Sequence, residues 1–153
     1  MQRSDPEVLE RAHLHVRRWF AQRMSKRMRF HDLEHTLTVT RTAIAIGRAM
    51  RISGADLFAL ELAALFHDTG YALAYEGHEE ESAELAEAFL AKQAVSITTR
   101  RKVRSLIMAT RMKSRVRGTL QAILRDADSA KAGQADFEAV SYTHLTLPTS
   151  DLV

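Results

Sequence analysis

The sequence contains no cysteine. Disulfide bonds, zinc–thiolate centres and thiol nucleophiles are therefore excluded. No apolar run approaches the roughly 20 residues that cross a bilayer, and the opening segment MQRSDPEVLERAHLH has no apolar core like that of a signal peptide. We therefore expect a cytoplasmic protein with no membrane partner.

Glycine and proline are scarce, with six and two residues among 153, and apolar residues recur at helical spacing almost throughout. No repeat, low-complexity tract or interdomain linker interrupts this pattern. We predict an all-α fold, a single compact bundle of about six helices. The expected helices span about residues 5–24, 32–50, 53–68, 78–92, 98–112 and 117–131.

The last fourteen residues, VSYTHLTLPTSDLV, differ from the rest and contain neither lysine nor arginine. Residues 140–149 resemble the conceptual translation of a transposon-derived sequencing adapter; the alternative is a genuine β-like or coil C-terminus. Segments of foreign origin are set aside when a fold is predicted. We therefore expect a helical domain over residues 1–139, truncated at its C-terminal end, and a non-native tail over residues 140–153.

The formal charge is only +3, but basic residues crowd residues 17–29 and 100–117, while residues 76–87 are acidic. Two interpretations explain this distribution equally well. The charged residues are on solvated helix faces, or they form an electropositive rim that attracts an anionic substrate such as a phosphate ester. No basic motif interleaved with aromatic residues favours nucleic acid as a partner.

The third expected helix is the most informative. Ser53 and Asp56 fit a capping box in which aspartate replaces glutamate. Glu61 is its only charged residue between that cap and its end, so we expect a central position in the bundle. The helix finishes at His67-Asp68. Because burying a carboxylate is costly unless it is paired or binds a metal, this dipeptide indicates a functional site.

Further histidines and aspartates could join that pair. His31 and His35 are four residues apart and would share one face of a continuous helix. Asp126 and Asp128 flank the apolar stripe of the last expected helix, and the pattern does not choose between them. Two histidines with two aspartates suit one or two divalent ions of Mn, Fe, Co, Ni or Zn, with Mg also a candidate.

Five ordered segments resemble the HD superfamily of metal-dependent phosphohydrolases: FHDLEHTLTV, ELAALFHDTGY, YEGHEEESAELAEAFL, LIMATRM and AILRDADSAKAG, over about residues 30–133. The resemblance implies the helical HD-domain bundle. It also implies that His35, His67, Asp68 and Asp128 are metal ligands, with Asp68 placed to bridge two ions. It favours Asp128 over Asp126, because the aspartate of the family usually follows an alanine.

His31 is identified by a second likeness. Its spacing to His35 resembles the HNxxH segment of cyclic-nucleotide phosphodiesterases, which implies that His31 protonates the leaving group. Asp32 stands where those enzymes have asparagine, and the alternative is a supporting or exposed side chain. The expected catalytic residues are thus His31 and Asp68.

Five residues are candidates for a second metal or for substrate contact: His78, Glu79, Asp126, Arg111 and Lys113. His78 resembles a histidine that some HD branches use for a second ion, and Glu79 could orient it. Arg111 and Lys113 follow the segment expected to face the site, where a phosphate contact by one of them would fit.

The sequence thus predicts hydrolysis of a phosphoester, a nucleotide or small phosphorylated metabolite, by a metal-activated water. One alternative is a non-catalytic HD module that senses a nucleotide or binds a partner. A scaffold, however, has no physical need for histidine and aspartate at the end of a buried helix. A second alternative is a helical nucleic-acid binder that uses residues 100–117.

Overall fold

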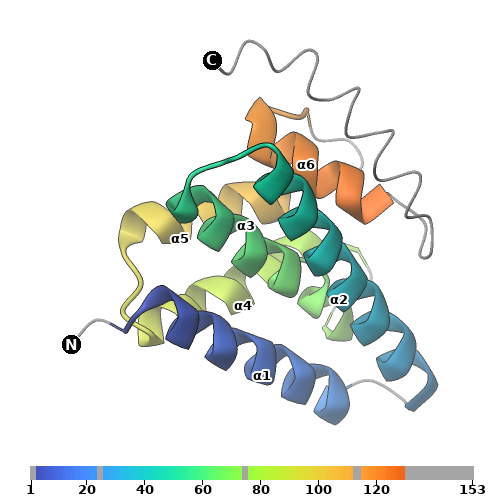
Figure 1. Ribbon diagram of the computed structural model, residues 1–153. Coiled ribbons are helices and arrows are strands. Elements are labelled where there is room, and N and C mark those ends of the chain that lie inside the picture. Colours follow the sequence, from blue (N-terminus) through green and yellow to red (C-terminus); the bar gives the residue numbers. More distant parts are fainter. Residues whose placement is uncertain (1–2, 24–25, 74–75, 112–114, 130–153) are drawn as a thin grey trace.

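The structure is a computed structural model that describes residues 3–23, 26–73, 76–111 and 115–129, without the side chains of residues 26–32. The described residues form six α-helices and one 3-10 helix, with no strand among them (Figure 1). The predicted all-α fold is confirmed. The expected tail and the domain boundary at residue 139 lie outside the described residues and stay predictions.

The elements follow one another with short connections. They are α1 (Asp5–Arg23), α2 (Lys26–Ala49), α3 (Gly54–Phe66), η1 (Thr69–Ala72), α4 (His78–Lys92), α5 (Ile97–Met108) and α6 (Gly118–Ser129). The bounds of α4 are those expected from the sequence.

The start of α3 confirms the predicted N-cap but gives Asp56 a different role. The Ser53 hydroxyl oxygen accepts a hydrogen bond from the Asp56 backbone N–H at 3.1 Å. The carboxylate of Asp56 accepts a hydrogen bond from Lys102 Nζ at 2.7 Å. The acidic residue of the expected capping box therefore links α3 to α5.

Two helix ends differ from the prediction. The second helix begins at Lys26, not near residue 32, because the lysine, arginine and methionine residues of this segment are good helix formers. The fifth helix ends at Met108, not at Met112. There the hydroxyl of Thr110 donates to the carbonyl of Ile107 at 2.7 Å, and such local side-chain bonds compete with helical ones.

The central element is α3, which contacts every other described element and lies in the middle of the bundle in Figure 1. Eight of its thirteen residues are buried. Each fully buried leucine or phenylalanine there contributes roughly 1.5–3 kcal/mol by leaving water. The predicted central position is confirmed, and the end of α3, where His67 follows, is held from several sides.

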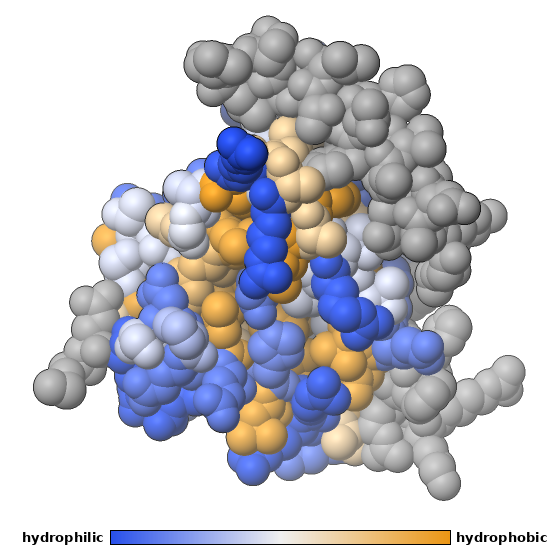
Figure 2. Space-filling model, in the orientation of Figure 1, coloured by the Kyte–Doolittle hydropathy of each residue, from blue (hydrophilic) through white to orange (hydrophobic). Residues whose placement is uncertain are grey.

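The basic stretch that begins at residue 100 is partly neutralised by α4. Arg100 Nε lies 2.8 Å from a Glu87 carboxylate oxygen, and Arg104 pairs with Glu84 at 3.1 Å. Figure 2 shows hydrophilic side chains interleaved with hydrophobic ones over the face toward the viewer. These pairs weaken the interpretation of a basic nucleic-acid-binding surface. Among the described helices, none is long and apolar enough to cross a membrane.

Candidate metal centre

Three helices bring four donor side chains to one place. His35 comes from α2, His67 caps the C-terminal end of α3, Asp68 follows it, and Asp128 comes from α6. One ligand atom of each lies within 4.8 Å of the others. The two histidines and two aspartates that the sequence singled out therefore meet in space, although up to 93 positions separate them in the chain.

Three of four histidine–carboxylate distances in the group are those of a coordination shell, and the fourth is slightly longer. Asp128 Oδ1 lies 3.0 Å from His35 Nε2 and 3.1 Å from His67 Nε2. Asp68 Oδ2 lies 3.3 Å from His67 Nε2 and 3.6 Å from His35 Nε2. Ligands held about 2.1 Å from one ion in tetrahedral or octahedral geometry are about 3.0–3.4 Å from their neighbours. The residues present therefore fit a divalent ion.

His67 is the most constrained member of the group. Its side chain has no exposed surface, and its Nδ1–H donates to the Ala64 carbonyl at 2.6 Å. That bond fixes the ring orientation and leaves Nε2 directed at the two carboxylates. Metal-binding histidines in proteins usually have their second nitrogen held in this way.

The electrostatics of the group favour a bound positive charge. Burial opposes charging of His67, but Asp68 and Asp128 outweigh it and raise the pKa of His67 well above 6.5. Burial also opposes ionisation of the two carboxyls, and the neighbouring histidines outweigh it, so their pKa values lie well below the usual range. Both carboxylates are ionised at neutral pH, and a proton and a metal ion compete for the space between them.

The second oxygen of Asp68 faces a different partner. Asp68 Oδ1 lies 3.4 Å from Nε2 of His78, which begins α4. The same nitrogen lies 3.1 Å from a carboxylate oxygen of Glu79. Burial opposes protonation of His78, but Asp68 and Glu79 raise its pKa above 6.5. Asp68 therefore connects the other three residues of the group to the His78–Glu79 pair.

The turn after Asp68 is held from two sides. Trp19 of α1 donates its indole N–H to the Thr69 carbonyl at 2.9 Å. The backbone N–H of Gly70 donates to the buried Ser82 hydroxyl at 2.8 Å. A Cβ on Gly70 would lie 2.1 Å from the backbone oxygen of His78, so only glycine fits. Sequence reasoning missed these contacts; the glycine two residues after Asp68 was the one available signal.

The remaining candidates are arranged differently. Asp126 is described but does not belong to the group of four. Arg111 lies near Glu80, with 3.8 Å between guanidinium and carboxylate, and is half exposed. Position 31 lies within α2, but the His31 side chain is outside the described part, as is Lys113. Their roles stay predictions.

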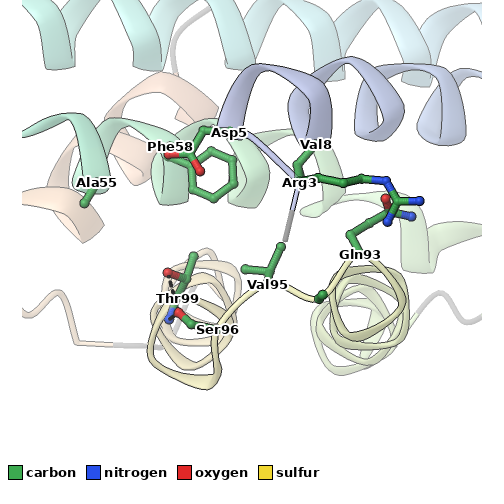
Figure 3. A pocket seen from close by; sticks show the side chains of 10 residues that line it. Arg3, Asp5, Val8, Ala55, Phe58, Gln93, Val95, Ser96 and Thr99 are labelled. Atoms are coloured by element: carbon green, nitrogen blue, oxygen red, sulfur yellow. Dashed lines mark hydrogen bonds between the residues drawn. The ribbon is translucent and has the colours of Figure 1, made fainter. Parts of the chain in front are cut away.

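A separate pocket lies at the beginnings of α1, α3 and α5 (Figure 3). Its volume is about 80 Å³, and its lining includes the rings and alkyl groups of Phe58, Val8 and Val95. Asp5 is its only carboxylate, and no histidine lines it. The pocket shares no residue with the group of four and offers no comparable set of metal donors.

Comparison with known proteins identifies the matching family. The family model of the HD domain matches residues 32–133, which is most of the chain. The matched span includes all four residues of the group, and His78 and Glu79 as well. No curated protein and no solved structure matches the chain significantly.

Proposed function

The chain belongs to the HD domain family, and from this premise we propose that it is a metal-dependent phosphohydrolase of small phosphoesters. A nucleotide or another small phosphorylated metabolite would be the substrate. The observation that carries the proposal is the convergence of His35, His67, Asp68 and Asp128, with His67 wholly enclosed.

The four side chains would hold the ion between them. A bound divalent ion would supply the Lewis acidity that activates water for attack on phosphorus and neutralises charge on the phosphoryl oxygens. The chain itself would contribute orientation. The Ala64 carbonyl fixes the ring of His67, and the contacts at Thr69 and Gly70 fix the backbone that follows Asp68.

Proton transfer to the leaving group would need a separate side chain. His31 is the candidate from the sequence. His78, whose ring contacts Asp68 and Glu79, would keep the second oxygen of Asp68 in place. Arg111, half exposed and paired with Glu80 of α4, stays the candidate for attracting the anionic substrate.

The test begins with the purified protein. Metal content is measured, and hydrolysis is then followed across nucleotides, cyclic nucleotides and sugar phosphates with Mn²⁺, Co²⁺, Ni²⁺ or Mg²⁺. We expect metal-dependent release of phosphate or opening of a phosphodiester. We also expect a loss of at least about 100-fold in metal affinity for His67→Ala, because losing even a supporting contact costs 10- to 100-fold.

The result also separates the proposal from its rival. Protein that binds metal and nucleotide but turns over no substrate would be a non-catalytic HD module. Protein that binds no transition metal would overturn the proposal. Because His67→Ala leaves a hole in the core, the half-exposed His35→Ala serves as a second variant that should fold normally.

A further inference from the structure

An exposed aromatic ring stacks on His78, the histidine that contacts Asp68 of the candidate metal centre. Within the described part of the chain, five large hydrophobic side chains are exposed, and two of them, Tyr71 and Leu73, are on the turn that follows Asp68. Tyr71 is 38 % exposed and Leu73 is 53 % exposed. Exposed apolar side chains scattered singly need no explanation, so what distinguishes Tyr71 is its contact with a residue of the candidate site.

Tyr71 is connected to the centre through a stacked ring. Its phenol ring stacks on the imidazole of His78, with centroids 3.9 Å apart and planes tilted by 15°. His78 Nε2 in turn lies 3.4 Å from Asp68 Oδ1. Tyr71 therefore contacts His78, and His78 contacts the candidate metal ligand Asp68.

The position of Tyr71 is fixed before any ligand arrives. Its backbone N–H donates to the Asp68 carbonyl at 3.1 Å. The preceding residue, Gly70, is packed against the start of α4 and bonded to Ser82. An aromatic ring already held in place loses little conformational freedom when another flat group stacks on it.

We propose that the exposed ring of Tyr71 forms a subsite for a planar aromatic group of the substrate. The phosphate would lie at the group of four, and the flat ring would stack on the phenol ring of Tyr71. This inference rests on the proposed function, because the centre supplies the phosphate end of the ligand. The subsite makes phosphoesters of an aromatic base better ligands than those of a bare sugar.

The test compares two ligands that differ only in the base. Phosphonate analogues of adenosine monophosphate and of ribose 5-phosphate, with a methylene in place of the ester oxygen, cannot be hydrolysed. Their dissociation constants are measured by calorimetry on the Mn²⁺-loaded full chain. Stacking of one base on an aromatic side chain is worth about 5-fold or more in affinity, so we expect the adenosine analogue to bind at least about 5-fold more tightly.

Three variants test whether the preference for the adenosine analogue comes from the phenol ring of Tyr71. Tyr71→Ala should remove the preference while leaving the affinity for the ribose analogue within about 2-fold, and Tyr71→Phe should keep it, because stacking needs the ring and not the hydroxyl. Leu14→Ala, a matched loss of an exposed apolar side chain on α1, should change neither affinity. Circular dichroism checks that each variant is folded.

The outcomes separate this inference from the proposed function. A wild type without preference for the base, a wild type that binds neither analogue, or a preference that survives Tyr71→Ala would each overturn the subsite. Equal weakening of both ligands by Tyr71→Ala would also overturn it, because that result means that Tyr71 acts only by supporting His78. A base preference that depends on Tyr71, in protein that hydrolyses neither natural ester, would keep the subsite and reject the hydrolase.

Discussion

His67 has both ring nitrogens committed, one to the Ala64 carbonyl and one to the carboxylates of Asp68 and Asp128. A fully buried histidine between two ionised carboxylates costs free energy unless a positive charge lies among them. The arrangement therefore favours binding of a cation, which is either a proton or a metal ion.

Which aspartate of α6 is the metal ligand, Asp126 or Asp128, can be tested by changing each to asparagine. Asp128→Asn keeps the size of the side chain but removes the charge that contacts His35 and His67, so we expect at least about a 100-fold loss of Mn²⁺ affinity. Asp126→Asn, the matched change two residues earlier, should bind Mn²⁺ like the wild type. Titration of metal into both variants gives the answer, and the reverse order of affinities would show that Asp126 is the ligand.

The same charges predict how the metal-free protein responds to pH. His67 and His78 have pKa values raised above 6.5, so the stability they contribute is present at pH below 6.5 and is lost as pH rises through their folded-state pKa values. Asp68 and Asp128 have pKa values lowered from 3.8, so their contribution is present at pH above 3.8 and is lost as pH falls through their folded-state pKa values.

Both contributions overlap in one window. We expect chelator-treated protein to be most stable between about pH 4 and pH 6.5. Urea unfolding at a series of pH values measures this. With Mn²⁺ in excess, the optimum should move to higher pH, because the ion replaces protons on the histidines. An optimum above pH 8 for the metal-free protein would contradict the assignment.

Single elements differ in how well the sequence predicts them. The starts of α3 and α4 follow from local signals, the N-cap at Ser53 and the acidic first turn after Gly77. The short helix η1 has no such signal. Contacts made only after folding, from Trp19 and Ser82, hold it in place, and no local pattern in the sequence records them.

The clamped turn makes a prediction at the level of this element. Gly70→Ala would place a Cβ 2.1 Å from the His78 backbone oxygen, so the turn and the start of α4 must separate. We expect a loss of about 3 kcal/mol in stability, at the upper end for overpacked sites, together with weaker Mn²⁺ binding.

Gly54→Ala is the matched control for this change. It lies in the first turn of α3, and a Cβ there would meet nothing within 4 Å. Its stability should be unchanged or slightly raised, because alanine narrows the unfolded ensemble. Urea unfolding measures the stability of both variants. Equal stability of the two would contradict the close packing of Gly70.

At the scale of the molecule, the candidate metal ligands could be predicted because their order and spacing along the chain resemble the pattern of a known family. His35, His67, Asp68 and Asp128 were all expected, and they converge because α2, α3 and α6 pack together. The stack of Tyr71 on His78 was not predictable, since it depends on how tightly η1 packs against α4.

The whole molecule should respond to metal as one unit. Three helices supply donors, so an ion that binds only the folded state raises the stability of the whole domain. At a free Mn²⁺ concentration 100 times the dissociation constant, the gain would be about 2.7 kcal/mol. Thermal unfolding with Mn²⁺ and with a chelator measures it. The midpoint of wild-type unfolding should rise with Mn²⁺ and that of Asp128→Asn should not; equal shifts would place the ion elsewhere.

The span between His35 and Asp128 has a consequence for a chain without cysteine. An ion held by both would tie together positions 93 residues apart. A covalent bridge that closes a loop of about 100 residues restricts the unfolded chain enough to stabilise the fold by about 4.7 kcal/mol in the simplest entropy treatment. Metal coordination would stabilise the fold as a disulfide bond does, but the link would be reversible. The lifetime of the folded domain would then follow the supply of metal rather than the redox state of its surroundings.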